Sequence, residues 1–108
     1  IDKIAQKRSK LVKQAHDGKL TASAMTPATL TLSNIGPGHI NHFTAIISPP
    51  QLAILSSGSI QSQPMVVNND IIVRPTTTFT LGVDHRAIDG ILAAAFLESL
   101  KLNLEKDR

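Results

Sequence analysis

The chain contains no cysteine, tryptophan or tyrosine, and only 3 of its 108 residues are phenylalanine. Without cysteine it cannot form disulfides, bind zinc through thiolates or use a cysteine nucleophile. So few aromatic rings leave little on which nucleic-acid bases could stack. The longest apolar run, residues 91–97, is too short to cross a bilayer, and no signal peptide is visible. We therefore expect no disulfide framework and no membrane contact.

The excess of positive charge is concentrated near the start of the chain. The formal net charge is +3, and the first twenty residues hold six basic side chains against two acidic ones. Such a segment can attract nucleic acid or anionic cofactors. A solvated helix face accounts for the same composition, and we expect this reading and no nucleic-acid partner. Salt-sensitive binding to DNA would identify the alternative.

Helical periodicity occurs at the two ends of the chain. Residues 2–16 form an amphipathic pattern that Gly18 is expected to stop. A second helix is expected over residues 89–105. Its predicted buried stripe consists of Ile91, Leu92, Ala95, Phe96, Leu100 and Leu104. Because Ile1 already belongs to a helical pattern, we expect the chain to be part of a longer protein.

Strand patterns fill the middle of the chain. Strands are expected at residues 29–33, 43–47, 51–60 and 76–83, and a loop containing Pro27 at residues 21–28. Residues 65–67 and 71–73 flank Asn68-Asn69-Asp70, which indicates a hairpin. The order of helix, strands and helix predicts one α+β domain, with an antiparallel or mixed sheet and helices on one face.

His85 is the first candidate for chemistry. It lies at a strand-to-helix junction between Asp84 and Arg86, with Asp89 four residues further on. An imidazole titrates near neutral pH, so it can accept a proton and return it. A neighbouring carboxylate could fix its tautomer. The alternative is an ordinary residue at a helix start, with Asp89 as the helix cap.

Other candidates are weaker on spacing alone. His39 and His42 could bind a metal together, but Gly-Pro-Gly precedes them and no third ligand is evident, so we expect no metal. Ser33 ends a strand and lies in no Gly-x-Ser-x-Gly elbow. Gly36 and Gly38 are too few and wrongly spaced for a nucleotide-binding loop.

The segment Asp84-His85-Arg86-Ala87-Ile88-Asp89-Gly90 resembles the DHRxxDG signature of the dihydrolipoamide acyltransferases of 2-oxo acid dehydrogenase complexes, distant relatives of chloramphenicol acetyltransferase. Three further blocks resemble the same family. Residues 15–20 are similar to ARxGKL, residues 29–36 to TFTISNLG, and residues 43–55 to FxAIINPPQxAIL. These blocks keep the order of the family, so the resemblance extends over nearly the whole chain.

The resemblance implies a reaction, namely transfer of an acyl group between a dihydrolipoyl thiol and coenzyme A. It makes His85 the general base and gives Ser33 the task of stabilising the oxyanion. Asp89 matches the motif aspartate, often counted as catalytic, and we expect it to organise the site by pairing with Arg86. Asp84 and Gly90 are also expected to organise the site, Gly90 by letting the backbone turn tightly into the helix.

The resemblance also implies an assembly. The site of the family lies between subunits of a homotrimer, and trimers build cubic or dodecahedral cores served by lipoyl domains and dehydrogenase components. Residues 1–108 would be the C-terminal half of a chloramphenicol acetyltransferase-like two-layer sandwich, in the cytoplasm or alternatively the mitochondrial matrix. Pro27-Ala28 and Ser48 depart from the family pattern. A non-catalytic assembly domain of the complex is the alternative function.

Overall fold

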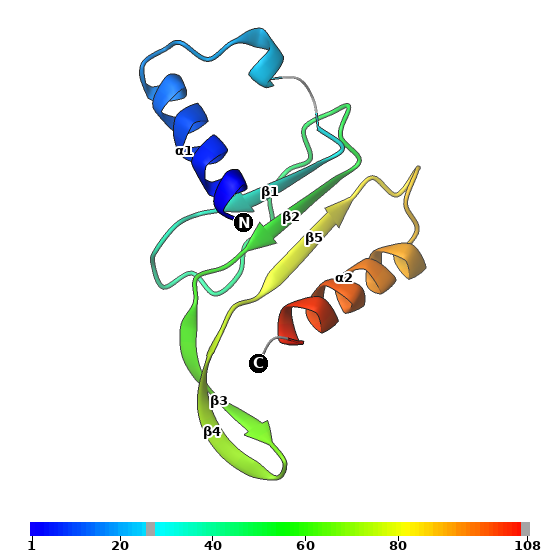
Figure 1. The fold of residues 1–108 in the computed structure, drawn as a ribbon. Coiled ribbons are helices and arrows are strands. Elements are labelled where there is room, and N and C mark those ends of the chain that lie inside the picture. The colour runs from blue at the N-terminus through cyan, green and yellow to red at the C-terminus, as the bar shows by residue number, and fades with distance from the viewer. Residues whose placement is uncertain (26–27, 107–108) are drawn as a thin grey trace.

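The computed structural model describes residues 1–25 and 28–106, and Figure 1 shows their arrangement. Pro27, expected in a loop, lies outside the described residues. The elements in chain order are helix α1 (Asp2–His16), the short 3-10 helix η1 (Ala22–Met25), strands β1 (Leu30–Asn34), β2 (Ala53–Ser57), β3 (Gln61–Val67), β4 (Asp70–Thr76) and β5 (Phe79–Val83), and helix α2 (Gly90–Glu105).

The central sheet has the order β1-β2-β5, with β1 parallel and β5 antiparallel to β2. β2 is the middle strand, and its residues Ala53, Ile54 and Leu55 are each only 6% exposed. Such a continuous apolar run suits a strand covered on both faces. The mixed sheet and two helices confirm the predicted α+β class.

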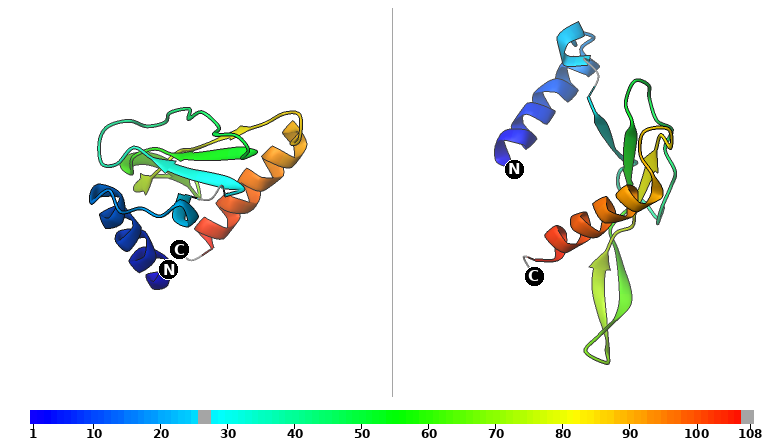
Figure 2. Two further views of the ribbon diagram at one scale, coloured as in Figure 1. Left: turned by 90° about the horizontal axis from the view of Figure 1, so that it is seen from above. Right: turned by 90° about the vertical axis from the view of Figure 1, so that its right-hand side faces the viewer.

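Both helices lie on the same side of this sheet (Figure 2). α2 packs against β5. Sheet residues Leu30, Ala53, Leu81 and Val83 face helix residues such as Phe96 across an apolar pocket of about 290 Å³. This layer brings together apolar side chains from all three strands and from α2.

The predicted buried stripe of α2 is confirmed in part. Leu92 and Phe96 line the apolar pocket against the sheet, and Leu100 is partly covered. Ile91, Ala95 and Leu104 are exposed. Ala93, Leu97 and Leu100 are the helix residues that are partly covered, whereas Ile91 is 83% exposed. α2 carries apolar residues around much of its circumference, so periodicity alone located the side that meets the sheet only in part. The sheet is also only three strands wide, and it covers one side of the helix.

The predicted strand at residues 43–47 is also wrong. This segment forms no ladder, and it crosses the face of the sheet opposite α2. Ser59 donates to the carbonyl of Ile40 from its backbone N–H at 3.0 Å and from its hydroxyl at 2.9 Å. The carbonyl of Asn41 lies 1.9 Å from where a Cβ on Gly58 would sit. The segment covers the sheet instead of adding a strand to it. Both roles suit an extended apolar segment, which is why the sequence pattern predicted a strand.

The predicted hairpin is confirmed, and its strands are longer than expected. β3 and β4 pair in antiparallel register around Asn68 and Asn69. These two residues have φ values of 51° and 67°, and a two-residue type I′ turn requires a positive φ at both of its central positions. Because Thr76 belongs to β4, the following strand β5 starts at Phe79, later than the sequence predicted. The hairpin extends well away from the central sheet (Figure 1).

Candidate active site

Residues 84–89 form the turn between β5 and α2, and Asp84 holds it to the sheet. The backbone N–H of Asp84 donates to the carbonyl of Leu52 at 2.8 Å, just before β2 begins. The carbonyl of Asp84 in turn accepts from the N–H groups of Ala87 and Ile88, each at 3.0 Å. His85 is therefore carried on a closed turn that is attached to the middle strand.

The carboxylate of Asp84 binds the residue on the far side of His85. It accepts from the backbone N–H of Arg86 at 3.1 Å, and from Nε and Nη2 of that side chain at 3.0 and 2.6 Å. These bonds from Arg86 lower the pKa of Asp84 to about 2, and they raise the pKa of Arg86. The expected pairing of Arg86 with Asp89 is wrong, because Asp84 is two residues away and already holds the guanidinium.

Asp89 is the N-cap of α2. Its side chain accepts from the N–H of Leu92 at 2.8 Å, and its backbone is extended at φ −81° and ψ 169°. This bond satisfies one of the N–H groups that a helix start leaves without a partner. The cap predicted at Asp89 is therefore confirmed, and it sets the point at which the chain leaves the His85 turn.

Gly90 differs from expectation. It is the first residue of α2, its φ lies outside the left-handed region, and a Cβ there would meet no atom within 4 Å. The backbone of this chain does not require glycine for a tight turn at this position.

The imidazole of His85 is exposed at the top of the turn. Among the hydrogen bonds of residues 1–25 and 28–106, none involves this side chain. Both nearby carboxylates are engaged elsewhere, Asp84 with Arg86 and Asp89 with Leu92. Within residues 1–25 and 28–106, no carboxylate is therefore hydrogen-bonded to the imidazole of His85.

Ser33 lies on β1, half-buried, in a row of hydroxyl side chains across the sheet. It is in register with Ser56 of β2, which is in register with Thr80 of β5. From Thr80, three more residues take β5 to its end at Val83, about 10 Å at the usual strand rise. The turn with His85 lies beyond that point. One chain therefore places Ser33 and His85 at opposite ends of its sheet.

A pocket of about 360 Å³ lies at the base of the His85 turn. Its lining residues are Ile47, Pro49, Pro50, Gln51, Leu52, Asp84 and Arg86. Gln51 also hydrogen-bonds the hydroxyl of Thr31 on β1. Sequence reasoning found Asp84 and Arg86 but missed Leu52, whose contribution is a backbone carbonyl and leaves no signal in the residue type.

The other sequence candidates do not form a site. His39 and His42 lie in the segment between β1 and β2. Within the described part of the chain, no group of three or more His, Cys, Asp or Glu side chains could hold a metal ion. Among the same residues, neither helix is long and apolar enough to cross a bilayer.

A mixed sheet with both helices on one side is the α+β fold that this chain shares with solved acyltransferase cores, and here it carries an exposed histidine on the turn between the last strand and the following helix. All 108 residues match the family described as 2-oxoacid dehydrogenases acyltransferase (catalytic domain), and the chain belongs to this family.

Characterised relatives agree with this assignment. A dihydrolipoyllysine-residue acetyltransferase component of the pyruvate dehydrogenase complex from Staphylococcus aureus is 39% identical over 101 residues, which are 94% of this chain and 24% of that protein. A dihydrolipoyllysine-residue succinyltransferase component of the 2-oxoglutarate dehydrogenase complex from Pseudomonas aeruginosa is 44% identical over 93 residues, 86% of this chain and 23% of the relative. The chain thus spans about a quarter of the relatives it matches.

Solved structures show the same fold. A probable dihydrolipoamide acetyltransferase from Listeria monocytogenes superposes with a TM-score of 0.90 at 38% identity, covering 95% of this chain and 44% of that one. Dihydrolipoamide acetyltransferase from Azotobacter vinelandii gives 0.83 at 32% identity, covering 93% and 42%. That structure concerns the role of a serine, a histidine and an asparagine in the catalytic mechanism. The cubic core of a pyruvate dehydrogenase complex gives 0.83 at 33%, with the same coverage.

Proposed function

We propose that residues 1–108 are the C-terminal half of the catalytic domain of a dihydrolipoamide acyltransferase, folded as part of a chloramphenicol acetyltransferase-like two-layer sandwich. The reaction is transfer of an acyl group between a dihydrolipoyl thiol and coenzyme A. The observation that carries this proposal is the exposed His85, held on a sheet-anchored turn within an acyltransferase core.

Residue spacing supports specific roles. The serine studied in the Azotobacter protein precedes its histidine by 52 residues, and its asparagine follows the histidine by 4. Ser33, His85 and Asp89 have the same separations. The third position is a carboxylate here and an amide there. Both side chains can accept a hydrogen bond from a helix N–H. The cap at Asp89 therefore explains how either an aspartate or an asparagine can start the helix at this position.

In the proposed mechanism, the imidazole of His85 takes the proton of the attacking thiol. Reference pKa values of about 8.5 for the thiol and 6.5 for imidazole make this step uphill by roughly 2.7 kcal/mol. The thiolate attacks the thioester carbonyl, and a new C–S bond forms as the carbonyl oxygen becomes an oxyanion. When the oxyanion collapses, the old C–S bond breaks, and the departing thiolate takes the proton back from His85.

The hydroxyl of Ser33 would donate to the oxyanion during this sequence. Loss of a donor of this kind costs on the order of 10² to 10³ in rate. Its place in the row with Ser56 and Thr80 keeps it on a rigid strand. A donor that is already oriented stabilises the intermediate without reorganising when charge develops.

These two residues must come from different chains if they act at one site. Ser33 and His85 of a single chain lie at opposite ends of the sheet, so one copy would supply the serine and a neighbour the histidine. We infer a homotrimer that builds a larger cubic or dodecahedral core. The resemblance to a cubic core supports this assembly. Its proposed partners are lipoyl domains, which deliver the dihydrolipoyl substrate, and the dehydrogenase components.

No metal has a part in the proposed reaction. The relatives named above are bacterial, which favours the cytoplasm over the mitochondrial matrix as the location.

The test is His85→Ala in the complete protein. Acyl transfer from acetyl or succinyl coenzyme A to dihydrolipoamide should fall to background, while circular dichroism and oligomer mass stay unchanged. Turnover close to that of the unaltered protein would refute the assignment of the base. An assembled oligomer with no thiol-dependent transfer even before substitution would favour the alternative, a non-catalytic assembly domain.

A further inference from the structure

Ser56, on the middle strand β2, is the most buried polar side chain in the part of the chain that the structure describes, at 2% exposed. Buried hydroxyls in proteins form hydrogen bonds as a rule. The nearby hydroxyls of Ser57, Ser59 and Thr77 each donate to a backbone carbonyl. Among the side-chain hydrogen bonds of residues 1–25 and 28–106, none involves the hydroxyl of Ser56. It is therefore free to turn toward a side chain beside it.

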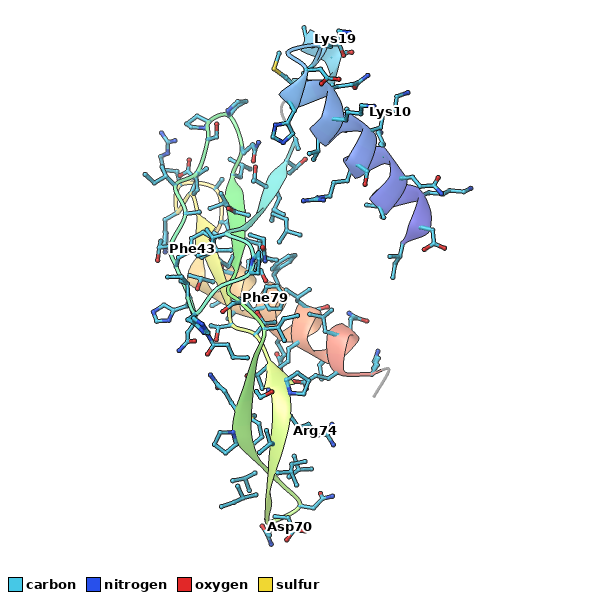
Figure 3. The ribbon with its side chains drawn as sticks, turned by 90° about the vertical axis from the view of Figure 1, so that its left-hand side faces the viewer. Lys10, Lys19, Phe43, Asp70, Arg74 and Phe79 are labelled. Atoms are coloured by element: carbon cyan, nitrogen blue, oxygen red, sulfur yellow. The ribbon has the colours of Figure 1, made fainter. Side chains whose placement is uncertain are left out.

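The burial of Ser56 comes from the segment that crosses the sheet, residues 40–47. This segment lies against Gly58, two residues after Ser56, and a Cβ on Gly82 would lie 3.8 Å from one of its backbone carbonyls. Gly82 pairs with the residue two before Ser56, so the two contacts lie on either side of it. Phe43, in the middle of the segment, lies on the side of the sheet away from α2 (Figure 3). The segment thus separates Ser56 from bulk water.

Ser56 shares this covered face with two other hydroxyl side chains. Ala53 lines the pocket that faces α2, and side chains alternate along a strand, so Ser56, three residues further on, projects to the opposite face. Its partners in the sheet, Ser33 on β1 and Thr80 on β5, project to the same face. Neighbouring strands lie about 4.8 Å apart. Rotation of the side chains can therefore bring the hydroxyl of Ser56 within hydrogen-bond distance of Ser33.

The direction of such a bond follows from the number of hydrogens. A serine hydroxyl has one hydrogen to donate and can accept two hydrogen bonds. If Ser33 gives its hydrogen to the oxyanion, a bond between Ser33 and Ser56 must be donated by Ser56. A hydroxyl that accepts a hydrogen bond also becomes a stronger donor, because bonds in a chain polarise one another.

We propose that Ser56 is a positioning residue for the oxyanion donor. Its hydroxyl donates to Oγ of Ser33 and so directs the hydrogen of Ser33 toward the reacting carbonyl. This inference rests on the proposed function, in which Ser33 serves the oxyanion. Since Ser56 is covered by residues 40–47, it acts only through Ser33 and does not touch the substrate.

The first test is Ser56→Ala in the complete protein, assayed with acetyl coenzyme A and dihydrolipoamide. The loss of one hydrogen bond to the donor should lower kcat by about threefold to tenfold and leave KM unchanged. Oligomer mass and circular dichroism should not change. An unchanged or raised kcat would overturn the proposal, because Ser56 would then make no bond to Ser33 or would compete with the oxyanion for its hydrogen.

The second test combines the substitutions. If Ser56 acts through Ser33, Ser56→Ala should have no further effect on kcat in a Ser33→Ala protein, because the hydroxyl that it orients is already absent. A merely structural role would lower kcat by the same factor in both backgrounds. That result would refute the positioning role.

Ser59→Ala is the matched control. Ser59 is another buried serine, 8% exposed, and its hydroxyl donates to the carbonyl of Ile40. Its backbone N–H also donates to that carbonyl, so the covering segment stays attached after the substitution. We expect kcat to be unchanged. A fall equal to that of Ser56→Ala would contradict the proposal, because the loss of any buried hydroxyl would then disturb the site.

The two proposals fail in different ways. If Ser33→Ala leaves kcat unchanged, the assignment of the oxyanion donor in the proposed function is wrong. If Ser33→Ala lowers kcat as expected and Ser56→Ala does not, only the role of Ser56 is wrong and the proposed function stands.

Discussion

The guanidinium of Arg86 binds the carboxylate of Asp84 through Nε and Nη2, and His85, between them in sequence, is left unbound. The ion pair therefore links the two residues on either side of the candidate base in the sequence. Arg86 is 90% exposed at its side chain, so solvent weakens the attraction, and the bridge serves mainly to shape the turn. The conformation of this turn matters because a general base must lie within hydrogen-bond reach of the thiol from which it takes a proton.

The Asp84–Arg86 bridge predicts a specific titration. Arg86 depresses the pKa of Asp84 to about 2, below its usual value of about 3.9. A depressed carboxylate pKa gives stability that is present above the unfolded value and lost as pH falls from about 4 toward 2. The contribution of the Asp84 carboxylate to stability should therefore be constant between pH 5 and 8. Carboxyl NMR should show Asp84 titrating near 2 in the unaltered protein and clearly higher in Arg86→Gln, and equal midpoints would contradict the bridge.

The cap at Asp89 separates a structural role from a chemical one. Asp89→Ala should destabilise the fold by about 1 kcal/mol, because the N–H of Leu92 loses its acceptor. Asp89→Asn should retain most of the stability and activity, since an amide oxygen caps almost as well. Urea unfolding and acyl-transfer rates on both variants provide the measurement. If Asp89→Asn loses activity as severely as His85→Ala, then Asp89 acts in the chemistry and its role as a cap is secondary.

Ser33→Ala should lower kcat by on the order of 10² to 10³ with little change in KM, because the lost donor serves the oxyanion and not the bound substrate. Unaltered oligomer mass is the control.

Mixing chains tests the shared site directly. Oligomers built only of Ser33→Ala chains or only of His85→Ala chains should be impaired at every site. In mixed oligomers, some sites would receive Ser33 from one chain and His85 from the other, so part of the activity should return. Co-refolding in a range of ratios measures it, and activity no higher than the sum of the two separate variants would show that both residues belong to one chain.

Two glycines should respond in opposite ways to alanine. A Cβ on Gly58 would lie 1.9 Å from the carbonyl oxygen of Asn41, which is backbone and cannot move alone. Gly58→Ala should displace the covering segment and cost several kcal/mol. Gly90→Ala meets open space in one chain and should change stability by less than about 1 kcal/mol. Thermal unfolding compares them. A large loss of assembled protein for Gly90→Ala alone would place a partner against that position.

Local chemistry made much of the fold predictable from the sequence. The left-handed tendency of Asn68 and Asn69 marked the hairpin, Gly18 marked the end of α1, and Asp89 marked the start of α2. Each of these residues determines the backbone conformation only of its near neighbours in the sequence. Elements fixed by such short-range preferences can be located without knowledge of the rest of the chain.

The failures concern contacts that depend on three-dimensional geometry and not on residue type. Residues 43–47 have the composition of a strand, but their environment is the face of the sheet and not its edge, and composition does not distinguish these. Arg86 had carboxylates available at Asp84 and Asp89, and only the geometry of the turn selected the nearer one. The distance between Ser33 and His85 depends on the direction of three strands, which no motif encodes.

β2 supplies none of the candidate catalytic residues, yet both are aligned by it. Ser33 takes its place by pairing with Ser56, and the His85 turn is tied to Leu52 at the other end of the same segment. A slip of one residue in this middle strand would turn its side chains to the wrong faces and shift both halves of the site together. The proposed chemistry thus depends on a strand that carries none of the candidate catalytic residues, and variants in β2 should impair catalysis at a distance.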